Sequence, residues 1–210
     1  MQGRCIAGKE FSQESEFGEW IRPVSNRPTQ EVSEEERRYE NGQDPRLLDV
    51  IVIQMIGHVP HAHQSENHVI DVDYYWSKVG TATWNDLDAA VEDPEEGLWT
   101  DGYSSYNGRN DRIPEAETLT LQSSLKLVEV DDFVVGVSVE GGTYRKRKLR
   151  ARFTLAGVHY ALGVTDPIQE RKYLALEDGD HLVGRARLCV SIGEPYQGYC
   201  YKLVAGIITP

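Results

Sequence analysis

The chain has 210 residues, of which 40% are hydrophobic, and a formal net charge of −12 at pH 7. The length allows one large or two small domains with a sizeable core, and the composition excludes a disordered chain. The acidic balance argues against a surface that holds nucleic acid all around, because lysine and arginine make most phosphate contacts, but it leaves room for a local basic stripe.

The first half of the chain predicts short strands. Residues 3–8 and 18–25 have strand patterns, and the chain begins so close to the first of them that an earlier strand is absent or supplied differently. Ser33 and Glu36 match a capping box, so we expect a short acidic helix near residues 33–41 as a surface excursion.

The apolar, β-branched run of residues 47–56 predicts an interior strand. Residues 60–67 follow it and are polar, so we expect them at a rim or a pocket and not in the core. Beyond a further predicted strand at 67–73 and a short helix near 83–91, residues 98–117 have no periodicity. A long ordered loop of this kind connects domains or carries function.

The second half, from residue 118 onward, predicts strands almost throughout. Ala156 and Gly157 mark a tight turn between two of these strands. Asp166 followed by Pro167 predicts the start of a short helix, because proline suits the first helical position. The pattern alone predicts an all-β barrel or sandwich.

A set of motifs resembles the bacterial dual OB-containing domain family. The motifs are residues 3–8, 20–25, 44–49, 63–67, 106–110, 193–196 and 198–202. The resemblance covers nearly the whole chain and implies a mainly β fold of two tandem OB-like small β-barrels with short helical inserts. It also implies, through the association of that family with prokaryotic conflict and defence systems, a role in sensing nucleic acid or nucleotides, and it implies no reaction. The resemblance also implies a further strand before the first motif.

On this basis we expect a first barrel at residues 1–97, with the acidic helix as an insert, a connecting loop at 98–117, and a second barrel at 118–210. Three scattered cysteines, Cys5, Cys189 and Cys200, follow no metal-binding or disulfide spacing. No apolar run approaches the roughly 20 residues of a membrane helix, and no signal-peptide pattern is present. We therefore expect a cytoplasmic location, no membrane partner and no cofactor.

A first group of candidate ligand-binding residues follows the apolar run. Gln64, Glu66 and Asn67 together offer donors and acceptors that can read the edge of a base, although such residues also commonly hydrogen-bond loop backbone. Arg22 is an anion candidate for the same pocket. His63, directly before Gln64 in the sequence, belongs to the same group of candidates.

A second group lies in the long loop, where Tyr106, Asn107, Arg109 and Asn110 combine an aromatic face with polar and cationic side chains. Single-strand binders stack bases on aromatics while arginine neutralises phosphate. The alternative is a self-packed connection in which the arginines pair with nearby acids.

The strongest local charge lies in the stretch 145–152, whose period-two alternation places apolar residues on one strand face and basic residues on the other. This stretch is either an edge strand protected by charge or a phosphate-binding stripe. The stripe would comprise Lys146, Lys148, Arg150 and Arg152, with Lys202 on the last strand as a weaker addition.

The function that these residues favour is a non-catalytic binding module for nucleic acid or a nucleotide-like ligand. No P-loop, nucleophile elbow or zinc-protease motif is present. One alternative is a protein–protein adaptor that docks through the acidic segment 30–44. A second is a metal-dependent hydrolase built on His61, His63 and Glu66, whose two histidines are weak metal candidates.

Overall fold

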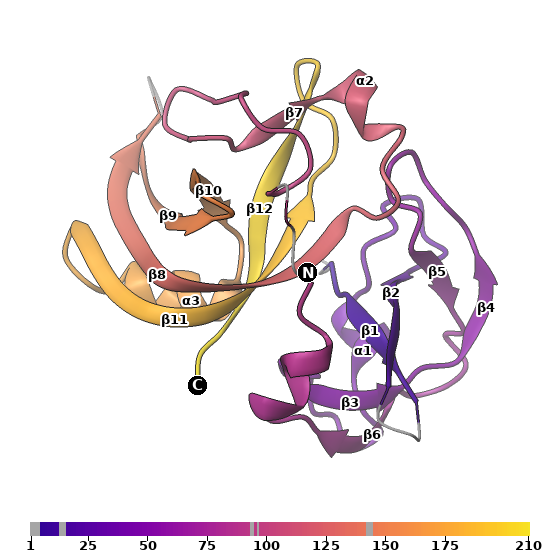
Figure 1. Cartoon of the computed structure of the whole chain (residues 1–210). Coiled ribbons are helices and arrows are strands. Elements are labelled where there is room, and N and C mark those ends of the chain that lie inside the picture. Colours follow the sequence, from indigo (N-terminus) through magenta and orange to yellow (C-terminus); the bar gives the residue numbers. More distant parts are fainter. Residues whose placement is uncertain (1–4, 13–15, 93–94, 96, 142–144) are drawn as a thin grey trace. The chain divides into compact units, whose positions relative to one another are not determined.

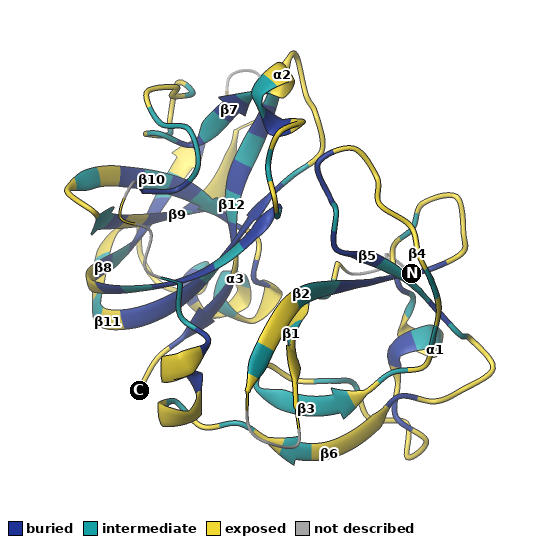
Figure 2. Ribbon diagram, turned by 45° about the vertical axis from the view of Figure 1, so that its right-hand side comes forward, coloured by how far each residue is buried: buried dark blue, intermediate teal, exposed yellow. Residues whose placement is uncertain are grey.

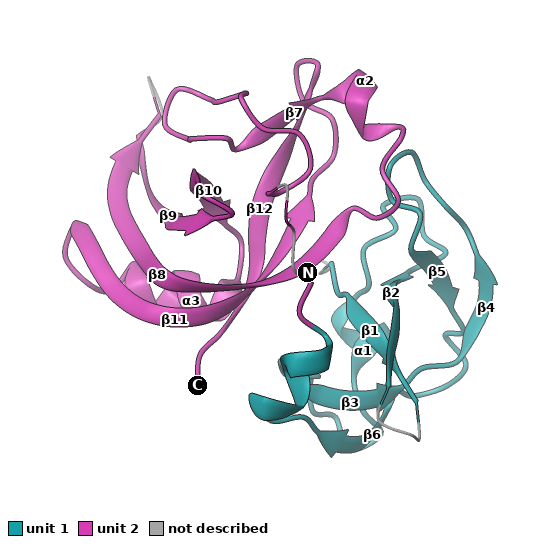
Figure 3. Ribbon diagram, in the orientation of Figure 1, with its two compact units in different colours: residues 1–90 teal, residues 91–210 magenta. Residues whose placement is uncertain are grey.

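A computed structural model describes residues 5–12, 16–92, 95, 97–141 and 145–210. The chain forms two compact units, residues 1–90 and residues 91–210 (Figure 3). None of the described helices is long and apolar enough to cross a membrane.

Unit 2 is a closed β-barrel (Figure 1). Its strands are β8 (Leu125–Glu140), β9 (Lys146–Leu155), β10 (Val158–Val164), β11 (Gly179–Ile192) and β12 (Tyr199–Ile208). β8 pairs with β9 and β11, β9 pairs with β10, and β11 pairs with β12, all antiparallel. β10 and β12 pair in parallel and close the ring. A closed five-stranded barrel with α3 (Pro167–Tyr173) between its third and fourth strands has the architecture of an OB-fold.

Local sequence explains the elements of unit 2. Ala156 and Gly157 have φ angles of 49° and 75°, the left-handed pair that a two-residue hairpin turn needs between β9 and β10. Asp166 caps α3 by accepting hydrogen bonds from the amides of Ile168 and Gln169, with Pro167 at the start of the helix. The barrel core consists of side chains from alternate positions of the strands. The buried residues of these strands are dark blue in Figure 2.

The expected connecting loop belongs to unit 2. Residues 98–117 contain β7 (Arg112–Pro114) and the start of α2 (Glu115–Thr118), and β7 pairs with β12. Arg109 forms an isolated bridge with Ala161 of β10. The segment therefore lies along both β10 and β12, and the division between units falls at residues 90 and 91, before the expected boundary at residue 97.

Unit 1 contains two sheets and two short helical elements. β1 (Gly8–Phe11), β2 (Phe17–Val24), β5 (Asn67–Ile70) and β4 (Met55–His58) form one sheet, and β3 (Asp49–Val52) pairs with β6 (Ser77–Thr81). α1 (Glu34–Arg37) follows β2, and a 3-10 helix covers Asn85–Ala89. The capping box is confirmed, since the Ser33 hydroxyl accepts from the Glu36 amide and the Glu36 carboxylate accepts from the Ser33 amide.

Unit 1 has the strand order of unit 2 with a different starting strand. β1, β2 and β5 correspond to β9, β10 and β12. β4 together with β3 corresponds to β11, and β6 corresponds to β8. The pairings among the matched strands have the same parallel or antiparallel direction. α1 follows β2 as α3 follows β10. β6 therefore occupies the place of the first barrel strand, although no pairing between β6 and β1 occurs in the described part of the chain.

The expectation of one interior strand at residues 47–56 is wrong. The run forms two strands, β3 and β4, that enter different sheets and are only partly buried, with Ile56 62% exposed. The core of unit 1 is small and built mainly from Val32, Tyr39, Ile70 and Trp76. A β-branched apolar run predicts strand conformation but does not report whether both faces of the strand find partners.

Candidate ligand-binding face

A shallow depression of about 480 Å³ lies on the outer face of β8, β9 and β10 in unit 2. Its lining comprises Arg109, Asp132, Val134, Arg152, Phe153, Thr154, His159, Tyr160, Ala161 and Asp180. The register places Val134 of β8 and Ala161 of β10 on either side of Arg152, and Thr154 opposite His159. Gly136 on β8 leaves room for the guanidinium of Arg152, whose Cζ would lie 2.9 Å from a Cβ at that position.

Among the described residues, Arg152 is held by one ion pair, and it is exposed. Its Nη1 donates to a carboxylate oxygen of Asp180, and the two side chains are 44% and 59% exposed. Ion pairs at such exposure contribute about 0–1 kcal/mol. The guanidinium can therefore leave Asp180 for another anion at low cost.

Arg109 brings a second guanidinium to the depression. Its backbone amide donates to the Ala161 carbonyl at 3.2 Å and its carbonyl accepts from the Ala161 amide at 3.0 Å, which fixes the residue against β10. The side chain is exposed and has no ion pair with any described residue. The fixed backbone and the exposed guanidinium suit contact with an anion.

His159, Thr154 and Asp132 form the polar end of the depression. The His159 Nδ1 lies 3.1 Å from the Thr154 hydroxyl, and the Thr154 amide donates to Asp132 at 2.9 Å. Burial raises the pKa of the Asp132 carboxyl, but the hydrogen bonds from Thr154 outweigh it and lower this pKa below its ordinary value. This end thus places a carboxylate, a hydroxyl and an imidazole close together.

The basic stretch forms β9, and its alternation agrees with the predicted pattern. Leu149 and Ala151 are buried, whereas Lys146 and Lys148 are exposed and have no ion-pair partner among the described residues. Arg150 differs from them, since both its terminal and inner nitrogens donate to Glu140, each at 2.8 Å, and Nη1 donates to Asp111 at 3.3 Å. The charge of Arg150 is therefore matched inside the protein.

Lys202 lies inside the barrel and not on the basic face. Its side chain is 0% exposed, and Nζ donates to Asp101 at 2.7 Å and to the Thr100 carbonyl at 2.8 Å. Burial lowers the pKa of the ammonium group, although Asp101 acts in the opposite direction. These contacts assign Lys202 to the packing of the barrel.

The loop candidates divide into exposed and structural residues. Tyr106 is fully exposed, so its ring is open to a stacking partner. Asn110 has a φ of 49°, accepts from the Gly102 amide at 2.8 Å and donates to the His159 carbonyl at 3.0 Å. Asn107 is exposed and hydrogen-bonds Glu140. Asn110 therefore shapes the loop against β10.

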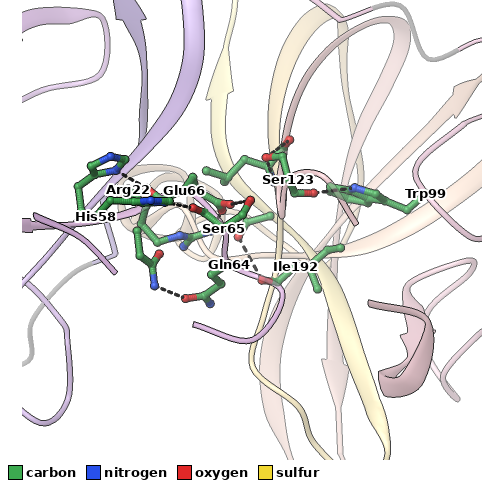
Figure 4. A network of polar contacts seen from close by, with 12 residues as sticks. Arg22, His58, Gln64, Ser65, Glu66, Trp99, Ser123 and Ile192 are labelled. Atoms are coloured by element: carbon green, nitrogen blue, oxygen red, sulfur yellow. Dashed lines mark hydrogen bonds and ion pairs between the residues drawn. The ribbon is translucent and has the colours of Figure 1, made fainter. Parts of the chain in front are cut away.

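The polar cluster after β4 is assembled in unit 1 (Figure 4). Arg22 on β2 and Glu66 form a buried ion pair at 3.1 Å, and β2 runs parallel to β5 so that Arg22 lies opposite Asn67. The Asn67 side-chain amide donates to Gln64 at 3.2 Å, while its Oδ1 is buried without a hydrogen-bond partner among the described residues. The structure thus brings Arg22, Gln64, Glu66 and Asn67 close together.

The three residues expected for a metal-dependent hydrolase, His61, His63 and Glu66, differ in exposure and contacts. His61 is exposed, His63 is buried, and the Glu66 carboxylate accepts from Arg22. No group of three or more His, Cys, Asp or Glu side chains placed to hold a metal ion occurs in the parts of the chain that the structure describes.

The lining residues of the depression that were not predicted include the polar Asp132, Thr154, His159 and Asp180. Thr154 continues the outward row of β9, and the predicted turn at Ala156 and Gly157 places His159 opposite it. The hairpin register was therefore the signal for these two residues. Asp132 and Asp180 depend on strand pairings over long sequence separations.

The closed barrel of unit 2, the related strand order of unit 1 and the open face on β9 and β10 define an OB-type protein, a class of binding modules. The chain belongs to the dual OB-containing domain family, whose family model matches residues 1–207. No curated protein and no solved structure matches the chain.

Proposed function

We propose that the protein binds nucleic acid or a nucleotide-like anion on the outer face of β9 and β10 in unit 2. The observation that carries this proposal is the depression that both Arg109 and Arg152 line. OB-folds bind oligonucleotides on the face of their second and third strands, which β9 and β10 are in unit 2.

The arrangement of charge supports an extended anionic ligand. Lys146, Lys148 and Arg152 lie on one face of β9, and a strand rises about 3.3 Å per residue, so their row extends about 20 Å. Phosphates spaced along a short single strand can contact such a row, and the exposed ring of Tyr106 is available to stack on a base. A mononucleotide would instead occupy the depression alone.

The acids in the depression set a condition on binding. Asp132 and Asp180 balance Arg109 and Arg152 in formal charge. A ligand phosphate must therefore displace Asp180 from Arg152, and we expect modest affinity.

The test is salt-dependent binding of labelled single-stranded DNA and RNA oligonucleotides, together with a nucleotide panel measured by thermal shift. We expect affinity to fall with salt, and the slope to become shallower in the double variant Arg109→Ala with Arg152→Ala. Arg171→Ala on α3 is the matched control, because it removes an exposed arginine that does not line the depression.

Three outcomes divide the possibilities. An unchanged slope in the double variant would remove this face from the proposal. Binding of one nucleotide without oligonucleotide binding would restrict the ligand to the depression, or to the Gln64 and Asn67 cluster if the double variant still binds. If neither oligonucleotides nor nucleotides bind, the proposal that the protein binds nucleic acid or a nucleotide is overturned.

A protein–protein adaptor is the second candidate, and the surface of unit 1 favours it. Val52, Ile56 and Val79 on β3, β4 and β6 are 47%, 62% and 64% exposed. Exposed apolar side chains of this size on neighbouring strands are typical of protein interaction surfaces. Replacing Ile56 and Val79 with serine would leave oligonucleotide binding unchanged and abolish an adaptor interaction.

A further inference from the structure

β7 adds an outer surface to the barrel of unit 2. It pairs with β12 so that Ile113 lies opposite Cys200, and Arg112 lies opposite Tyr201. Ile113 and Cys200 are fully buried. Because successive side chains of a strand point to opposite faces, Arg112, Tyr199 and Tyr201 point outward. β7 is not one of the five barrel strands, so this surface lies beyond the strands on which OB-folds bind oligonucleotides.

The guanidinium of Arg112 lies over the ring of Tyr199, with Cζ 4.0 Å from the ring centroid. At this distance the face of the ring attracts the cation. Arg112 makes no hydrogen bond or ion pair with any residue in the described parts of the chain, and its Nε is buried without a hydrogen-bond partner there. Arg150 differs, because Glu140 and Asp111 match its charge. Arg112 is therefore positioned by an aromatic ring while its N–H groups are left for a ligand.

Two further tyrosines border the pair of Arg112 and Tyr199. The ring centroid of Tyr103 lies 6.3 Å from that of Tyr199, with 54° between the planes, and the Tyr103 hydroxyl donates to Glu117 at 3.3 Å. The backbone of Tyr196 exchanges two hydrogen bonds with that of Tyr199, at 2.7 Å and 3.2 Å, and the Tyr196 side chain is 61% exposed. Exposed tyrosine rings are the faces on which single-strand binders stack bases.

This surface continues the face that carries the depression. Arg109 lies beside Ala161 of β10 and three residues before Arg112, so the Cα atoms of the two arginines are at most about 11 Å apart. Gly163, which shares the outward face of β10 with Ala161, pairs with Leu203 of β12. One ligand can therefore contact Arg109 in the depression and Arg112 beyond it.

We propose that Arg112 and Tyr199 form a second subsite, which binds one phosphate of an extended single-stranded nucleic acid while another part of the same strand occupies the depression. The N–H groups of Arg112 donate to the phosphate oxygens, in the paired geometry that arginine favours. A neighbouring base stacks on the exposed ring of Tyr196. The second subsite rests on the proposed function, and it specifies the ligand as a strand of several nucleotides and not a mononucleotide.

Nearby acids limit the second subsite to one phosphate. Glu117 on α2 accepts from Tyr103, and Glu115 on the same helix donates its backbone amide to the Gly198 carbonyl, next to Tyr199. Carboxylates on α2 disfavour a row of phosphates, so Arg112 should contribute about one unit to the salt dependence of binding. Because Tyr199 already holds the guanidinium, the contact costs little side-chain entropy.

The first experiment measures how affinity depends on strand length. Labelled oligothymidylates of about two to about twelve nucleotides, and thymidine monophosphate, are titrated into the full chain and its variants. Arg112→Gln should weaken binding of the longer strands about tenfold and leave binding of the monophosphate unchanged. Arg112→Lys, which keeps the charge and loses the planar fork, should weaken it less. Lys172→Gln is the matched control, because its ammonium also lies over a tyrosine ring, at 5.0 Å, and does not line the depression. Thermal unfolding verifies that the variants are folded.

The second experiment identifies the phosphate, by replacing one linkage of the strand at a time with an uncharged methylphosphonate. At one linkage the replacement should weaken binding to the unaltered protein about tenfold and leave binding to Arg112→Gln unchanged. The second subsite is overturned if oligonucleotides bind Arg112→Gln as tightly as the unaltered protein, if Lys172→Gln weakens binding equally, or if no linkage depends on Arg112. If no oligonucleotide or nucleotide binds the unaltered protein, the proposed function itself is overturned, and the second subsite with it.

Discussion

Lys202 Nζ lies 2.7 Å from Asp101 Oδ1 inside unit 2, and the lysine side chain has no solvent exposure. The other carboxylate oxygen of Asp101 accepts from the Tyr160 hydroxyl at 2.6 Å. One carboxylate thus holds two side chains, from β10 and β12, against the segment that precedes β7. The contacts of Asp101 with Lys202 and Tyr160 hold the segment before β7 over the barrel between β10 and β12.

Removal of this carboxylate should be strongly destabilising. Asp101→Asn leaves the Lys202 ammonium buried without a counter-charge, and breaking a buried pair typically costs about 3–5 kcal/mol. Asp178→Asn is the control, because Asp178 pairs with Arg147 at an exposed position and should cost less than about 1 kcal/mol. Denaturant unfolding, with hydrogen exchange of the β12 amides, measures both. Equal losses in the two variants would contradict a structural role for the buried pair.

Local patterns predicted most of unit 2. The alternation of β9, the turn at Ala156 and Gly157, and the proline-led start of α3 are each set by neighbours in sequence. The burial and pairing of the charged residues depend on partners far away in sequence. Lys202 meets an acid 101 positions earlier, and Arg150 meets one 39 positions away, so their burial and pairing could not be read from spacing.

Unit 1 was harder to predict for a different reason. Its apolar run at 47–56 has strand propensity, but propensity contains no information about which sheet each half joins. The position of β6 as the first barrel strand also depends on topology alone. The ion pair of Arg22 with Glu66 and the stacking of His58 and His68 both depend on strand pairing and register, which the sequence does not show.

Acidification should weaken unit 2 through Glu140. Burial raises the pKa of this carboxyl, but the hydrogen bond and charge of Arg150 outweigh it, so the pKa lies below the ordinary 4.5. The folded state then binds the proton less tightly than the unfolded state, and the stabilisation is present above about pH 4.5 and lost as the pH falls through the lowered pKa. Urea unfolding from pH 7 to pH 3 tests this. Glu140→Gln should be less stable at pH 7 and should lose less stability on acidification; a parallel loss in both proteins would exclude Glu140 as the source.

Asp166 should contribute more than an ordinary helix cap. Its Oδ1 accepts from two amides at the start of α3, and its Oδ2 accepts from the buried Ile207 amide on β12 at 3.3 Å. Asp166→Ala therefore removes a cap and leaves a strand amide unsatisfied, at a combined cost of about 2–4 kcal/mol. Ser33→Ala, which removes only the cap of α1, should cost about 1 kcal/mol. Unfolding free energies of the two variants should differ accordingly, and similar values would show that the Ile207 contact adds nothing.

Gly136 should control the position of Arg152 on the proposed ligand-binding face. A Cβ at Gly136 would lie 2.9 Å from Arg152 Cζ and 3.2 Å from its Nε, so the guanidinium must move while the backbone stays. Gly136→Ala should therefore fold normally and weaken oligonucleotide binding severalfold, although the net charge is unchanged. Gly163→Ala is the matched control, because its Cβ would only touch Leu203 at 3.4 Å. Thermal unfolding and binding at a single salt concentration decide the matter: unaltered affinity in Gly136→Ala would mean that Arg152 acts only as a general positive charge, and equal weakening in both variants would mean that the sheet itself is disturbed.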